Sequence, residues 1–253
     1  MKNRSIKHSF GSLLSTVALW SLGSLHAADA PAPAPAPDKE AWKSVASAGI
    51  TLTRGNSETL LGTANINSEK KRRMNELGLG ANAAYGEDRG IQNAGSVGAF
   101  SQYNRLISDR LFAYARVDLL HDSIADVDYR VGLSPGLGYY VIKNDRHSLR
   151  AEVGPGYVLE KLGGQDRSYL TLRVAERYEL KINERARLWQ SAEFMPRVEE
   201  FEDYVLNFEI GVSTDITQSF GLRVFAQDTY RSRPAFGRDK NDLKLVAGVE
   251  YKF

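Results

Sequence analysis

The chain has 253 residues, with 33 lysines and arginines against 31 aspartates and glutamates, a formal net charge of +2 and no cysteine. The lack of cysteine excludes disulfides, thiolate catalysis and cysteine-ligated metals. The interleaved charges argue against a nucleic-acid-binding protein, which would carry a basic stripe. Beyond residue 30, no apolar run approaches the roughly 18–20 residues that a membrane-spanning helix needs.

The N-terminal region has the composition of an export signal. Residues 1–27 combine lysine and arginine in the first seven positions, an apolar run over Phe10–Leu25, and Ala27 as a small residue at the cleavage position. Residues 28–40 are rich in alanine and proline, which favours an extended spacer. We therefore predict a cleaved signal peptide over 1–27, a periplasmic linker over 28–40 and a folded body over 41–253.

The body alternates between apolar and polar residues with a period of two. From Val127 to Val141 every odd position is apolar, aromatic or proline, while the even positions carry Asp128, Arg130 and three glycines. This period is that of a β-strand with one apolar face. The sequence predicts twelve such strands, approximately at 41–53, 58–68, 75–86, 93–106, 111–121, 126–142, 148–161, 168–182, 187–198, 203–215, 219–231 and 241–253.

Three features favour an apolar face that points to lipid over one that fills a soluble core. The predicted strands are long, whereas strands of soluble proteins usually have about 5–6 residues and tilted membrane-spanning strands about 9–11. The polar face carries charges in mid-strand, which a wet lumen tolerates better than a dry core does. Tyrosines lie near many strand ends, as an interfacial girdle requires. We therefore predict an all-β fold, an antiparallel transmembrane β-barrel of about 12 strands of the outer-membrane type.

The last predicted strand has the features of an assembly signal. It ends on Phe253, with Tyr251 and Val249 at alternate positions before it. Bacterial outer-membrane barrels typically end this way, and the barrel-assembly machinery reads that strand. We therefore expect the bacterial outer membrane as the location, and outer-membrane lipid, lipopolysaccharide and the assembly machinery as partners. No nucleic-acid partner and no cofactor are expected.

The sequence also predicts the register of the two strands that flank residues 143–147, and it contains two breaks in the apolar–polar alternation. If Lys143–His147 is a five-residue turn, the residue numbers of facing pairs sum to 290, which places Pro135 opposite Pro155. The same register places Arg130 opposite Glu160. Two acidic residues break the alternation by falling on the lipid-facing parity; a bulge is the expected explanation for both, and pairing at an oligomer interface is the alternative. They are Glu176 and Asp228.

The inward parity collects the charged residues predicted to line the lumen. They are Arg116, Asp118, Arg130, Arg150, Glu152, Glu160, Arg173, Arg177, Glu193, Arg197, Glu209, Arg223 and Lys244. Two interpretations remain open. An excess of inward arginine would make a narrow channel that favours small anions, whereas complete internal pairing would make a structural or envelope-stress barrel that conducts nothing.

Catalytic and metal-binding groupings are weak. Only two of the four histidines follow residue 27, and His121 with Ser123 is the nearest approach to a hydrolase pair, without a third member. A divalent cation held by His121 with Asp122, Asp126 and Asp128 is a further candidate, but acidic residues in loops are usually solvated. We therefore expect no enzyme activity and no metal site, with an outer-membrane hydrolase as the least favoured interpretation.

Four segments together resemble a known family. They are the opening strand Trp42–Gly55 followed by Asn56–Thr59, the paired motifs Ser134–Tyr139 and Gly154–Tyr157, and the terminal Tyr251–Phe253. The chain resembles, over residues 42–253, the salt-stress-induced outer-membrane protein family, also called domain of unknown function 481. The resemblance implies an integral outer-membrane protein of a Gram-negative bacterium with a response to salt or osmotic stress. It carries no established catalytic motif.

Overall fold

The computed structural model describes residues 42–53 and 59–253. The predicted signal peptide (1–27) and linker (28–40) lie outside the described residues, as does the connection over 54–58. The described residues contain no helix that is long and apolar enough to span a membrane.

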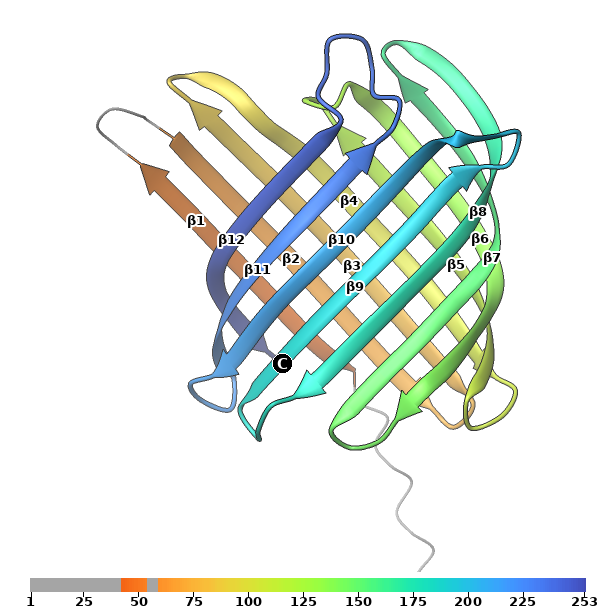
Figure 1. Ribbon diagram of the computed structural model, residues 1–253. Coiled ribbons are helices and arrows are strands. Elements are labelled where there is room, and N and C mark those ends of the chain that lie inside the picture. Colours follow the sequence, from red (N-terminus) through yellow and green to blue (C-terminus); the bar gives the residue numbers. More distant parts are fainter. Residues whose placement is uncertain (1–41, 54–58) are drawn as a thin grey trace, which may run out of the picture. The chain divides into compact units, whose positions relative to one another are not determined.

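The described residues form twelve antiparallel strands that close into one barrel (Figure 1). The strands are β1 (Lys43–Thr53), β2 (Thr59–Arg72), β3 (Asn75–Asp88), β4 (Ile91–Leu106), β5 (Leu111–Asp122), β6 (Val127–Lys143), β7 (His147–Leu162), β8 (Gln165–Lys181), β9 (Ala186–Arg197), β10 (Glu200–Asp215), β11 (Phe220–Arg231) and β12 (Asn241–Lys252). The predicted all-β barrel of about 12 strands is therefore confirmed. The second strand runs four residues further than predicted, because its ladder with β3 continues to the pair Arg72 and Asn75.

The first and last strands close the barrel. Within the ladder, Ala46 lies opposite Tyr251. The backbones of Ser44 and Phe253 exchange two hydrogen bonds, of 3.1 and 3.0 Å. The Tyr251 ring stacks on that of Phe253 and packs against that of Phe220 on β11. The C-terminal aromatic residues thus lie at the barrel seam, where closure is completed.

Short turns join the strands at the end of the barrel where the C terminus lies, which we call the terminal end (Figure 1). Four of these turns begin with a side chain whose oxygen accepts backbone N–H groups further along. Asn144 accepts from the amide of His147 at 2.7 Å, and Asn183 accepts from that of Ala186 at 2.8 Å. Ser108 and Thr217 do the same in their turns. These local bonds explain why the chain reverses there. We call the opposite end the loop end.

The outward face of the barrel is apolar. Leu137 and Val153 are 51% and 50% exposed, although both lie in the middle of long strands. Tyr129 and Tyr139 point outward near the two ends of β6. Their separation of ten residues corresponds to about 25 Å along the barrel axis, for a rise of about 3.3 Å per residue and a tilt of about 40°. That height matches the apolar band of a transmembrane barrel, so the apolar side chains face lipid.

The predicted register between β6 and β7 is confirmed over Tyr129 to Tyr140. No ladder pairs form between Ser134 and Gly136 within this hairpin, because the facing prolines lack an N–H group. The strands approach closely at this point: a Cβ atom on Gly154 would lie 2.1 Å from the Pro135 carbonyl oxygen. Glycine is therefore required beside the proline.

The predicted bulges at Glu176 and Asp228 are wrong. The strands that carry them, β8 and β11, keep an uninterrupted register with both neighbours at these positions. Glu176 stays on the lipid-facing side and accepts a hydrogen bond from the Gln190 side chain of β9. This local partner satisfies the carboxylate without disrupting two ladders, as a bulge would.

Candidate functional site: the barrel interior

The interior is bridged by side chains from strands that are not neighbours in the sheet. Gln102 of β4 donates a 3.0 Å hydrogen bond to Glu152 of β7. Glu152 also accepts a 2.8 Å bond from Arg173 Nη1 and lies 3.3 Å from Arg150 Nε, while its own side chain is only 4% exposed. Glu152 is therefore the centre of a buried polar network inside the barrel.

The network continues in both directions from Glu152. On one side, Arg116 donates to Gln102 at 3.1 Å and forms an ion pair with Asp118 at 2.6 Å. On the other side, Arg173 Nε donates to Glu193 at 2.6 Å, and Asn207 of β10 donates to Glu193 at 3.3 Å. Hydrogen bonds and ion pairs thus connect β4 and β5 to β10 through the lumen.

All eight basic members of the predicted lumen set have a carboxylate partner within 4.0 Å. Besides those described above, the contacts include Arg130 Nε to Glu160 at 2.7 Å, Arg177 to Glu179 at 2.8 Å, Arg197 to Glu199 at 3.3 Å, Arg223 to Glu209 at 3.6 Å and Lys244 to Asp242 at 3.3 Å. The thirteen predicted residues lie on the parity opposite to the lipid-facing residues, and Arg130 pairs with Glu160 as the register requires. Local pairing reduces the positive field that unpaired arginines would create.

A packed cluster narrows the interior toward the terminal end. Leu106, Phe112, Tyr114 and Tyr140 pack together and are buried. The Tyr140 hydroxyl donates to Glu76 of β3 at 2.9 Å, which links β6 to a strand three places away. On this side of the barrel, aromatic rings and hydrogen-bonded side chains fill the lumen.

The middle of the wall formed by β2 and β3 is different, because the inward side chains there are small or amidic. Asn65 lies opposite Asn82, and Asn67 lies opposite Gly80. Asn67 and Asn82 are exposed although they face the barrel interior, which means that water reaches them there. We call Asn65, Asn67 and Asn82, with their inward glycine neighbours, the asparagine strip.

Glycine allows close packing along the asparagine strip. A Cβ atom on Gly80 would lie 2.2 Å from the Phe100 ring and 2.8 Å from Asn67 Oδ1, and one on Gly98 would lie 2.8 Å from Asn82 Oδ1. The asparagine side chains therefore lie along the wall, over the glycines of the next strand. Sequence reasoning singled out the charged inward residues and missed this strip. The sequence pattern that could have revealed the strip is the repetition of asparagine and glycine on the inward parity of two consecutive strands.

The connection between β11 and β12 crosses the mouth at the loop end. Its Ala235 is buried against Val127 at the start of β6 and Leu162 at the end of β7. In the closed ring of twelve strands, β12 and β6 lie on opposite sides. We call residues 232–240 the mouth loop, and Figure 1 shows this loop above the ends of β11 and β12.

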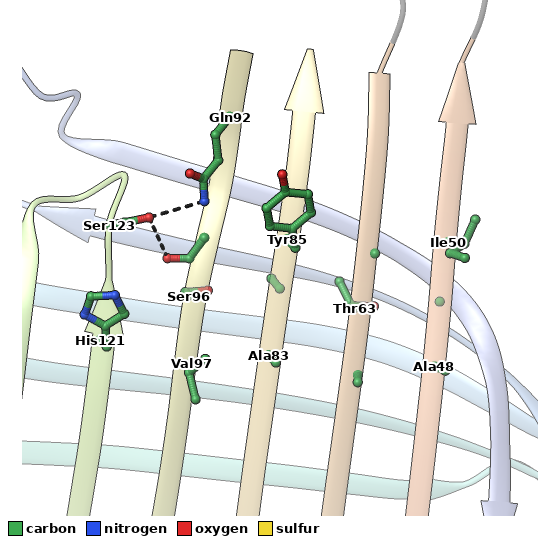
Figure 2. Close-up of a pocket in the computed structure, with 15 residues that line it drawn as sticks. Ala48, Ile50, Thr63, Ala83, Tyr85, Gln92, Ser96, Val97, His121 and Ser123 are labelled. Atoms are coloured by element: carbon green, nitrogen blue, oxygen red, sulfur yellow. Dashed lines mark hydrogen bonds between the residues drawn. The ribbon is translucent and has the colours of Figure 1, made fainter. Parts of the chain in front are cut away.

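An open groove of about 650 Å³ lies on the wall of β1 to β5 near the loop end (Figure 2). It contains the weak hydrolase pair. His121 Nδ1 lies 2.8 Å from the Asp128 carbonyl oxygen, while Ser123 Oγ donates to the Gly95 carbonyl at 3.1 Å and lies 3.5 Å from Gln92 Nε2. Histidine and serine thus bind different partners. Within 42–53 and 59–253, no three histidine or acidic residues are grouped to hold a metal ion.

A closed twelve-stranded barrel with an apolar outer band and a polar interior defines an outer-membrane-type β-barrel. The family described as "Protein of unknown function, DUF481" matches residues 46–253, so the chain belongs to this family, as its motifs predict. A comparison with curated proteins gives no match.

Two solved structures are similar in fold. The NanC porin has 10% sequence identity and a TM-score of 0.52, covering 83% of this chain and 100% of its own. The COG4313 outer membrane channel from Pseudomonas putida F1 has 10% identity and a TM-score of 0.50, covering 87% of this chain and 100% of its own. Both similarities extend over nearly the whole barrel.

Proposed function

We propose that the protein is a narrow channel for small polar solutes in the outer membrane of a Gram-negative bacterium. The observation that carries this proposal is the asparagine strip, where Asn67 and Asn82 are exposed to water inside a closed barrel. Small and amidic side chains leave space and bind polar solutes by hydrogen bonds without holding them tightly. The side of the lumen along β5 to β9 is filled by the network around Glu152, which restricts the path to the side of β2 and β3.

The proposal includes the route by which the protein reaches the membrane. Residues 1–27 direct export and are removed, and the barrel-assembly machinery inserts the barrel by reading the strand that ends in Phe253. The apolar outer band supports this location, because exposing that band to water would cost a large amount of free energy. A role in salt or osmotic stress remains a proposal that rests on the family resemblance, and salt-dependent growth of a deletion strain tests it.

The ion selectivity of the channel depends on where carboxylates neutralise the inward arginines. The six inward arginines predicted on β5 to β9 all have carboxylate partners, so the middle of the path is close to neutral. At the loop end, four arginines and two carboxylates surround one small cavity. We therefore assign the anion preference predicted from the sequence to the mouth, and we expect it to be modest. We also propose that the protein is not an enzyme, because His121 and Ser123 bind different backbone carbonyls.

Conductance of the purified protein in planar lipid bilayers tests the proposal. Wild-type protein should give small discrete openings. Asn82→Trp should reduce them strongly, because indole would fill the strip. Ala81→Trp is the matched control: Ala81 is the next residue, is exposed and points toward lipid, so conductance should stay unchanged.

A second candidate function is that of a structural barrel that conducts nothing. The network that spans β4 to β10 supports it, because side chains fill that part of the interior. In that case correctly folded wild-type protein gives no openings in the same bilayers. That outcome contradicts the channel and favours the structural barrel.

A further inference from the structure

A small cavity lies at the loop end of the barrel, close to the mouth loop. Its volume is about 10 Å³, which is room for a single particle about the size of a water molecule. Five strands and the mouth loop contribute its charged side chains. These are Arg130, Glu160, Arg167, Asp203, Arg231 and Arg233.

Arg231 is the unusual member of this group. It is the last residue of β11 and is 7% exposed. Its Nη1 atom is buried and has no hydrogen-bond partner among the described residues, and no ion pair of Arg231 is found among them either. A buried cation without a partner is costly, so the surroundings favour an added negative charge.

The nearby carboxylates are already engaged by other groups. Glu160 accepts hydrogen bonds from Arg130 and from the Tyr169 hydroxyl. The second carboxylate of the cavity, Asp203, lies 3.9 Å from Arg197 Nη1. Arg233 pairs with Glu200 at 2.6 Å. Arg231 is therefore left as a source of positive charge in a cavity that no side chain fills.

We propose that this cavity binds one halide ion, which is chloride in ordinary saline media. A monatomic anion suits the size of the cavity, and the planar guanidinium of Arg231 supplies N–H donors to it. The site also concerns the mouth loop, because the Arg231 amide donates to the Lys240 carbonyl at 2.7 Å across the base of that loop. A bound halide neutralises Arg231 and thereby stabilises the loop over the mouth.

The first test measures the thermal unfolding midpoint in sodium chloride, sodium bromide and sodium gluconate at equal ionic strength. Gluconate is too large for the cavity. We expect the halides to raise the wild-type midpoint by about 2–4 °C relative to gluconate, as binding to the folded state alone requires. Arg231→Met should abolish this difference. Arg177→Met is the matched control, since Arg177 lies near the terminal end and should leave the halide effect unchanged. Equal midpoints in halide and gluconate for the wild type would overturn the proposal.

A second measurement covers the case in which Arg231→Met does not fold. Crystals of the wild-type protein grown in bromide should show an anomalous peak within hydrogen-bond distance of Arg231 Nη1. A water molecule there, with no bromide peak, would contradict the site. Neither test requires the barrel to conduct, so this inference and the channel can fail separately.

Discussion

Glu152→Gln is the most informative single change in the interior. Glutamine keeps the size of the side chain but removes the charge that lies against Arg150 and Arg173. The Glu152 side chain is 4% exposed, so solvent provides little compensation. Removing one member of a buried ion pair costs about 3–5 kcal/mol. Arg173 retains Glu193, and glutamine retains one acceptor oxygen, so we expect a loss near the lower limit, about 3 kcal/mol of unfolding free energy.

Urea titration of the barrel in lipid vesicles, followed by its heat-modifiable migration on gels, measures this loss. Glu179→Gln is the matched control, because Glu179 also pairs with an inward arginine but is 55% exposed. Exposed pairs contribute less than about 1 kcal/mol, so the control should lose little. Equal losses for the two variants would refute the conclusion that Glu152 is the centre of the network.

The same variant changes selectivity if the barrel conducts. It adds one net positive charge to the lumen, which stabilises an anion about 10 Å away by about 0.4 kcal/mol in a water-like medium. That energy corresponds to a shift in permeability ratio of about twofold toward anions. Reversal potentials under a salt gradient measure it, and a shift toward cations would contradict the sign.

Three further predictions follow from the fold. Phe253→Ala should lower the yield of heat-modifiable barrel in the outer membrane, because the ring packs at the seam between β12 and β1; unchanged yield would leave the assembly signal unsupported. A cysteine at Asn207 should react with a small charged thiol reagent and one at Leu206 should not, and the reverse pattern would overturn the facing of the strands. His121→Ala should leave folding and any lipase or protease signal unchanged; a hydrolase activity lost in this variant would disprove the non-enzyme proposal.

The strands and their facing were predictable because the period of two is a local property of the sequence. The β6–β7 register was predictable for a similar reason, since a short turn fixes which residues face each other. The accommodation of Glu176 and Asp228 on the lipid-facing side was not predictable, because the side chain that satisfies Glu176 is Gln190 on another strand.

The interior was predictable as a set of residues but not as an arrangement. The bond between Gln102 and Glu152 joins strands three places apart, and only the closed curvature of the barrel brings them together. The contact of Ala235 with Val127 across the mouth has the same origin. The asparagine strip was missed because uncharged residues gave no reason to choose them until their exposure inside the barrel was known.

Thiol modification of an open channel tests the central claim most directly. Asn82→Cys protein is inserted into a planar bilayer, and a small charged thiol reagent is added while single openings are recorded. We predict a discrete, lasting drop in conductance, because the added group would occupy the asparagine strip, and no change in the lipid-facing control Ala81→Cys. Openings that persist unaltered in fully modified Asn82→Cys protein would contradict a path along the strip.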